Sequence, residues 1–229
     1  MAKTETLSIQ GGMGQLECYF ARPEGEGPFP GVVVIHEAFG LNDNIREITR
    51  RFADAGYAAL AVDLFAGRNR ALCMFRFIGQ LQFNSLHNGS VQDLKYVLTY
   101  LSALPQVEGN RIGAIGFCMG GSFAIAWACT DERLKVIAPF YAMNPRPLKA
   151  VERLCPVVGS YPGNDFTAKA GRRLDTALDT YKVRHDIKIY HNTRHSFFNR
   201  QNSDAAVSAS EDAWQRIQAF FQEYLVEAP

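Results

Sequence analysis

Short apolar runs alternate along the chain with longer segments of helical periodicity. Residues 31–35 (GVVVI) and 58–62 (AALAV) are apolar throughout, which predicts strands buried on both faces of a parallel sheet. A hairpin is expected to open the chain, with strands at 6–9 and 16–21 around the glycine-rich turn 11–14. Four further strands are predicted at 111–117, 134–140, 156–160 and 186–191.

Between the strands, apolar residues recur three and four positions apart and predict helices. The first helix can be capped by Asn42 or Asp43 and ends at Gly56, and Pro105 stops the second. Alternation of strands and helices is typical of a mainly parallel sheet with helices on both faces. The predicted helices span 45–55, 91–104, 122–130, 167–183 and 205–225.

Residues 63–90 show neither the alternation of a strand nor the three-and-four spacing of a helix, and three glycines interrupt them. We expect a loop with short helices here, forming a cap-like insertion near the functional site. Within it, residues 72–83 are rich in Phe and Leu and are expected to cover an apolar pocket. Because no repeat, low-complexity segment or linker divides the chain, residues 1–229 are expected to form a single domain.

Composition and charge narrow the class of protein. Of the 229 residues, 47% are hydrophobic, which excludes a disordered tail and is enough for a core. With 24 basic and 23 acidic residues, the net charge is +1, so no strong field would attract nucleic acid. The chain shows no apolar run of about 20 residues and no signal peptide, so neither a membrane span nor export is expected. Five cysteines without a C-x-x-C pair fit a reducing cytoplasm.

The segment Gly116–Gly121 (GFCMGG) stands between a predicted strand and a predicted helix. A G-x-C-x-G sequence in that place is typical of a nucleophile elbow, with cysteine where serine is commoner. Small flanking residues allow the sharp turn, and the N-terminus of the following helix would favour the thiolate of Cys118. The backbone N–H of Met119 would face a developing oxyanion. The alternative is that Cys118 is a small buried core residue.

A nucleophilic thiol needs a base and a group that orients the base. Asp165 and His195 each follow a later predicted strand, and the order Cys118, Asp165, His195 is that of α/β-hydrolases. Asp165 could equally be a helix N-cap. His191 and His195 are spaced H-x-x-x-H, which makes a metal pair only on a helix, so no metal site is predicted. For His36 a structural role is expected.

Further motifs occur at 33–40 (VVIHEAFG) with 44–46 (NIR), 56–65 (GYAALAVDLF), 156–165 and 195–199 (HSFFN). Together with the cysteine elbow they resemble the dienelactone hydrolase family of α/β-hydrolases, from about Phe29 to the C-terminus. The resemblance implies an α/β-hydrolase fold. It also implies a hydrolase that cleaves a small ester or lactone through a thioester on cysteine, without a metal or organic cofactor.

The same resemblance implies roles for individual residues. Cys118, Asp165 and His195 would form the catalytic triad. Glu37 matches the family's carboxylate beside the nucleophile, which accepts or holds the proton of the thiol until substrate binds. Glu37 directly follows a buried apolar strand, so a place at the active edge of the sheet is a better interpretation than an ordinary surface charge. The backbone N–H of Ala38 would be the second oxyanion donor beside that of Met119.

The substrate is less defined than the chemistry. Family members that cleave dienelactone hold the substrate carboxylate with arginines, whereas the residue four past the histidine is here Asn199. Arg200 is one candidate, unless it only pairs on the surface. Tyr141 matches an aromatic residue of the family's pocket, the alternative being plain core packing. The insertion offers further arginines, namely Arg68, Arg70 and Arg76.

Two other classes of function stay open at this point. One is a non-catalytic relative that binds a small ligand, which loss of a triad residue would favour. The other is a thiol redox sensor centred on Cys118, although no resolving cysteine lies near it in the sequence. The favoured partner is a small-molecule ester or lactone, with neither nucleic acid nor a membrane, and the protein would be a monomer or small homo-oligomer.

Overall fold

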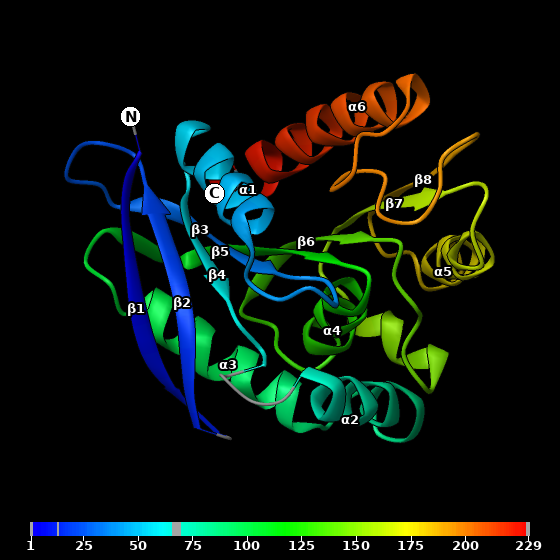
Figure 1. Cartoon of the computed structure of the whole chain (residues 1–229), viewed down its shortest axis with the longest axis horizontal. Coiled ribbons are helices and arrows are strands. Elements are labelled where there is room, and N and C mark those ends of the chain that lie inside the picture. Colours follow the sequence, from blue (N-terminus) through cyan, green and yellow to red (C-terminus); the bar gives the residue numbers. More distant parts are fainter. Residues whose placement is uncertain (1, 13, 66–69, 228–229) are drawn as a thin grey trace.

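A computed structural model describes residues 2–12, 14–65 and 70–227, apart from the side chains at positions 70 and 81. Its centre is an eight-stranded sheet in the order β1-β2-β4-β3-β5-β6-β7-β8 (Figure 1). The first two strands and β4 pair antiparallel, and all pairs from β4 to β8 are parallel. The strands are β1 (Lys3–Gly11), β2 (Gly14–Arg22), β3 (Phe29–Ile35), β4 (Ala58–Val62), β5 (Val107–Phe117), β6 (Leu134–Phe140), β7 (Val157–Pro162) and β8 (His185–Tyr190).

Helices cover both faces of the sheet, as the alternation of strands and helices predicted (Figure 1). Helices α1 and α6 pack on one face, and α2, α3, α4 and α5 pack on the other. The helices are α1 (Asp43–Asp54), α2 (Arg70–Phe83), α3 (Gly89–Ser102), α4 (Met119–Ala128), α5 (Thr167–Tyr181) and α6 (Asp204–Phe221), with a 3₁₀ turn η1 (Leu148–Arg153) and a π turn η2 (Gln222–Val226). No helix in the described part of the chain is long and apolar enough to cross a membrane.

The parallel strands are buried on both faces because their side chains alternate between two cores. In β3, Val33 and Ile35 belong to the core under α3 and α4, whereas Val32 and Val34 belong to the core under α1 and α6. All four are fully buried. This explains why the sequence of β3 is an unbroken apolar run rather than an alternation of apolar and polar residues.

The prediction of a loop with short helices in 63–90 is wrong, because α2 is one continuous helix of 14 residues. Cys73 and Phe77, one helical turn apart, are buried. The ring of Phe77 lies 5.6 Å from that of Phe65 and 5.5 Å from that of Phe123. Tertiary packing of this one face therefore holds a helix through Gly79, which a local pattern treats as a break.

Helix α4 begins three residues earlier than predicted, at Met119 instead of Ser122. The sequence Gly-Gly at 120–121 has low helix propensity, and this moved the predicted start of the helix towards the C-terminus. In the structure the helix follows Cys118 at once. The difference matters for function because the chain turns from β5 into α4 at the cysteine itself.

Candidate active site

Five residues singled out in the sequence lie in loops at the carboxyl ends of parallel strands. Glu37 follows β3, Cys118 follows β5, Tyr141 follows β6, Asp165 follows β7 and His195 follows β8. These strands run in the same direction, so the five loops meet at one edge of the sheet. Ligands of open α/β sheets bind at this edge.

The backbone of Cys118 has φ 54° and ψ −113°, which is unusual for a residue other than glycine. The N–H of Cys118 donates to the carbonyl oxygen of Phe140 at 3.0 Å, and its carbonyl accepts the N–H of Ser122 at 3.0 Å. Bonds to β6 and to α4 therefore hold the strained residue from both sides. This is the geometry that the elbow motif predicts.

Glycines at positions 116 and 120 are required by close packing around the elbow. A Cβ on Gly120 would lie 2.5 Å from the carbonyl oxygens of Ile35 and His36. A Cβ on Gly116 would collide with the backbone of Gly120. The start of α4 can thus approach the end of β3, which brings Cys118 towards the loop that carries Glu37.

The thiol of Cys118 is half-buried, and burial is the main reason that its pKa is raised to about 11. The N–H of Met119 lowers this pKa, but the negative charges of Glu37 and Asp165 raise it further. The N–H at the helix N-terminus therefore favours the thiolate, as predicted, but burial outweighs this one N–H and the net pKa is raised. The resting thiol is protonated at neutral pH.

The other cysteines described here are also free thiols. Burial raises the pKa of Cys18, Cys129 and Cys155 to about 12 each, above that of Cys118. Cys73 is buried in α2. None of these four follows a strand at the edge where Cys118 lies.

Asp165 and His195 are hydrogen-bonded, with Oδ2 of Asp165 3.1 Å from Nδ1 of His195. The other carboxylate oxygen, Oδ1, accepts the N–H of Thr167 at 2.8 Å and also the Thr167 hydroxyl. The N-cap of α5 is Phe166, so the alternative that Asp165 is the N-cap is wrong, although Asp165 still bonds to the first residue of the helix. One oxygen anchors the start of α5, and the other holds the imidazole with Nε2 left over for proton transfer.

Two aromatic side chains contact the His195 ring. The ring centre of Tyr141 lies 4.8 Å away, and the ring of Phe166 stacks at 5.7 Å with only 10° between the planes. Phe166 is 70% exposed, so it forms an outer wall beside the imidazole. The His195 side chain itself is 29% exposed, which leaves it accessible from solvent.

Glu37 is buried, with only 4% of its surface exposed. Its Oε2 accepts a hydrogen bond of 2.8 Å from the hydroxyl of Ser196, the residue directly after His195. The neighbouring His36 is fully buried, and its Nε2 accepts the N–H of Leu64 at 2.9 Å while Nδ1 donates to the Glu37 carbonyl at 2.6 Å. Through these two bonds His36 supports the loop after β3, in agreement with the structural role predicted for it.

The two residues predicted to donate N–H groups to an oxyanion lie at the same edge of the sheet. Ala38 sits in a turn closed by the N–H of Gly40, which donates to the Glu37 carbonyl at 3.2 Å. Met119 is the first residue of α4. Their function as oxyanion donors stays a prediction.

Tyr141 is buried beside His195. It is 1% exposed, with φ 38°, and its hydroxyl has no hydrogen-bond partner. Burial raises its pKa, as do the charges of Glu37 and Cys118, while the charge of Arg200 acts in the opposite direction. Whether Tyr141 binds substrate or only packs in the core stays a prediction.

The candidate arginines differ in position. The exposed guanidinium of Arg200 lies 4.7 Å from the centre of the exposed Phe39 ring, and no ion pair of Arg200 occurs in the described part of the chain. Arg76 lies on α2, with its guanidinium 5.9 Å from the Phe77 ring. Arg68 and the side chain of Arg70 lie outside the described residues. Whether Arg200 or Arg76 binds substrate stays a prediction.

Sequence reasoning missed three residues that support the site, namely Ser196, Thr167 and Phe166. The spacing Asp-x-Thr before a helix is a known local hydrogen-bonding pattern and could have indicated Thr167. Ser196 bonds to a residue 159 positions away, so no local signal could have indicated its partner.

Among the described residues, no group of three or more His, Cys, Asp or Glu side chains is arranged to hold a metal ion. His191 lies just past β8 and is exposed, outside any helix.

The model of the dienelactone hydrolase family matches residues 16–225, nearly the whole chain. The chain belongs to the dienelactone hydrolase family. A protein from Saccharolobus solfataricus strain P2, provisionally named carboxymethylenebutenolidase, is 30% identical over 91% of this chain and 94% of its own length. Membership makes this chain a hydrolase of the ester and lactone class.

Solved structures agree with this assignment. The dienelactone hydrolase-like promiscuous phosphotriesterase P91 from metagenomic libraries superposes with a TM-score of 0.85 and 26% identity, covering 97% of this chain and 98% of that one. The esterase of Pyrobaculum calidifontis has a TM-score of 0.74 at 17% identity, covering 96% of this chain and 85% of that one. The second likeness concerns the fold, which is that of the α/β-hydrolases.

Proposed function

We propose that this family member hydrolyses a small carboxylic ester or lactone, with Cys118 as nucleophile and His195 as the proton-transfer group. The observation that carries the proposal is the pairing of His195 with Asp165 at 3.1 Å, at the sheet edge where the strained Cys118 also lies. Nucleophile, base and orienting carboxylate are the three parts that covalent acyl transfer needs.

The raised pKa of Cys118 bears on how the reaction begins. A thiol with a pKa of about 11 is not a nucleophile at neutral pH, so its proton must be removed when substrate is present. The negative charge of the buried Glu37 carboxylate raises that pKa, and we propose Glu37 as the group that accepts the proton. This supports the role that the family resemblance implies for Glu37.

The proposed cycle starts with the thiol of Cys118 protonated, Glu37 ionised and His195 charged against Asp165. In acylation, the thiol proton passes to Glu37, the sulfur bonds to the carbonyl carbon, and the carbon–oxygen bond of the ester breaks. The leaving oxygen takes the proton from Nε2 of His195. The product is a thioester on Cys118 with neutral His195 and protonated Glu37.

Deacylation returns each group to its starting state. Nε2 of His195 takes a proton from water, and the hydroxide formed attacks the thioester carbon. The carbon–sulfur bond breaks, the acid product leaves, and Cys118 recovers its proton from Glu37. N–H groups of Ala38 and Met119 would stabilise the oxyanion in both halves.

The class of substrate follows from the same chemistry. Thiolates leave more readily than amines, so a tetrahedral adduct of an amide tends to revert, and esters or lactones are favoured. The relative from Saccharolobus solfataricus carries the name of an enzyme for an unsaturated lactone, and this adds butenolide-type lactones to the substrates worth testing. For binding a substrate carboxylate we propose Arg200, which is exposed beside Phe39.

The same observations weigh against a redox sensor at Cys118. Sensor cysteines are low-pKa thiols and are often accompanied by a resolving cysteine. Here the pKa of Cys118 is raised to about 11. A non-catalytic relative is disfavoured because all three triad residues are present.

Trapping the acyl-enzyme tests the proposal. Wild-type protein mixed with 4-nitrophenyl butyrate and quenched in acid should gain one butyryl group, and peptide mapping should place it on Cys118. Cys118→Ala should abolish both hydrolysis and labelling, whereas Cys155→Ala, another half-buried thiol, should keep both. Hydrolysis retained by Cys118→Ala would overturn the mechanism. A panel of butenolides and aryl esters, run beside it, then identifies the preferred class.

A further inference from the structure

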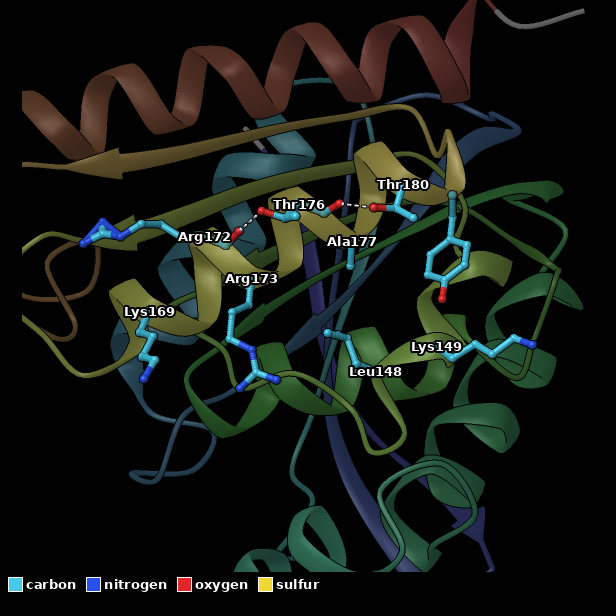
Figure 2. Close-up of a pocket in the computed structure, with 9 residues that line it drawn as sticks. Leu148, Lys149, Lys169, Arg172, Arg173, Thr176, Ala177 and Thr180 are labelled. Atoms are coloured by element: carbon cyan, nitrogen blue, oxygen red, sulfur yellow. Dashed lines mark hydrogen bonds between the residues drawn. The ribbon is translucent and has the colours of Figure 1, made fainter.

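A basic groove lies between α5 and η1, outside the residues of the catalytic site (Figure 2). We call it the α5–η1 groove, and its volume is about 490 Å³. Its wall combines apolar, hydroxyl-bearing and basic side chains. They are Leu148, Ala177 and Tyr181, then Thr176 and Thr180, then Lys149, Lys169, Arg172 and Arg173.

The charges on α5 are sorted around the helix. The basic residues Lys169 and Arg173 are four positions apart and share one side, with Arg172 beside them on the helix. On another side, Asp175 and Asp179 lie 3.3 Å and 3.7 Å from Nε2 of His185 on β8. The acidic side chains of α5 thus face the neighbouring strand β8, and none of them lines the groove.

The four basic side chains of the groove make no ion pair with any residue that the structure describes. In Figure 2, Arg173 and Lys169 extend from α5 towards the side on which Leu148 lies, while Arg172 extends along the helix. In a chain of net charge +1, such a cluster is a local excess rather than a consequence of composition. It creates a positive potential in the groove.

A second cavity of about 230 Å³ continues the groove and shares Leu148, Lys169 and Arg173 with it. It adds the exposed Arg146 and reaches Phe166, whose ring stacks on His195. Asn144 also lines this cavity. Its side-chain N–H donates to the Ala170 carbonyl at 3.0 Å, but its buried Oδ1 has no partner. The extension therefore adds a fifth basic side chain, that of Arg146, to the four of the groove.

We propose that the α5–η1 groove binds a small organic phosphate, with the phosphate on Arg173 and Lys169 and an apolar body against Leu148 and Tyr181. A phosphate monoester carries about −1.5 to −2 charges at pH 7, which matches several unpaired cations better than one carboxylate would. The guanidinium of Arg173 can bind two phosphate oxygens at once. The volume lies within the range of about 300–1,000 Å³ that is usual for ligand pockets.

The binding experiment uses the intact protein and 2-naphthyl phosphate as probe, measured by titration calorimetry at low salt. Inorganic phosphate supplies the charge alone, and 2-naphthoate supplies the ring with a single carboxylate. We expect the aryl phosphate to bind with the highest affinity, and its affinity to fall with added NaCl because the cations are exposed. Cys118→Ala should bind the probe as wild type does, since the groove lies outside the catalytic residues.

Substitutions locate the binding. Arg173→Gln and Lys169→Gln should each weaken it about tenfold, the effect of losing one charge-assisted hydrogen bond. Arg184→Gln removes an exposed charge outside the groove and should leave the affinity within about twofold of wild type. Equal affinity in Arg173→Gln and wild type, loss of binding in Cys118→Ala, or no heat with any probe would each overturn the proposal. Equal affinity for inorganic phosphate and the aryl phosphate would contradict the proposed contact of an apolar ligand body with Leu148 and Tyr181.

Discussion

The hydroxyl of Ser196 donates a hydrogen bond of 2.8 Å to the carboxylate of Glu37, across 159 residues of chain. Ser196 adjoins His195 in the loop after β8, and Glu37 lies in the loop after β3. Both residues are buried, and Ser196 has φ 61°, a strained conformation for serine. The bond therefore ties the position of the acid to the loop that carries the histidine.

Breaking this bond should cost stability because a buried carboxylate loses its donor. We expect Ser196→Ala to lower the free energy of unfolding by about 1–3 kcal/mol in urea titrations. In a double-mutant cycle with Glu37→Gln, the two losses should be non-additive by about 0.5–3 kcal/mol. Ser210→Ala removes a buried hydroxyl bonded only to carbonyl oxygens. Its loss of unfolding free energy should be additive with that of Glu37→Gln. Additive losses for Ser196 and Glu37 would contradict the coupling.

Alkylation by iodoacetamide should report the raised pKa of Cys118. Only the thiolate reacts, so the rate should be low at pH 7 and rise about tenfold per pH unit until the pH nears 11. Glu37 raises this pKa, so Glu37→Gln should lower it and give faster alkylation at pH 8. The same variant should hydrolyse esters more slowly, because the proton acceptor is gone. Peptide mass spectrometry measures the label at each cysteine.

The control for alkylation is Glu47→Gln, which removes an exposed acid from α1 and should leave the profile unchanged. Cys18, Cys129 and Cys155, whose pKa values are raised to about 12, should react after Cys118. A Cys118 profile that levels off below pH 8 would show a thiol already activated at rest.

Asp165→Asn should separate the two functions of Asp165. Asparagine can still accept the Thr167 N–H, so the midpoint of thermal unfolding should change little. The imidazole would lose its anionic partner, and kcat for an aryl ester should fall about 10³-fold or more. Thr167→Val should show the opposite balance, with lower stability and a smaller loss of kcat. An unchanged kcat in Asp165→Asn would leave Asp165 as a helix anchor only.

Tyr141→Phe removes a buried hydroxyl that has no hydrogen-bond partner. Since an unsatisfied buried group is unfavourable, thermal stability should stay equal or rise, by up to about 1 kcal/mol. Tyr161→Phe is a matched control, because its hydroxyl is also buried without a partner while its ring packs on Gly171 of α5. Both variants should be as stable as wild type, but only Tyr141→Phe should change KM or kcat. Equal kinetics in the two would assign Tyr141 to the core.

Local features of the sequence were enough to predict most of the strands and the strained elbow. The run at 31–35 is apolar at every position because β3 is buried on both faces, so its hydrophobic pattern follows from its burial. The glycines at 116 and 120 record the close approach of α4 to β3. Motif order placed Asp165 and His195 at one edge, since parallel strands end together.

The sequence by itself therefore determined the sheet, the elbow and the triad candidates, because each depends on neighbours within a few residues or on chain order. Tertiary structure alone decided the rest. Burial and two carboxylates from other loops raise the pKa of Cys118, although the N–H of Met119 acts in the opposite direction. The contact of Ser196 with Glu37 and the packing of Phe77 that holds α2 join segments far apart in the chain. Such contacts depend on which segments meet in space, and no local pattern encodes that.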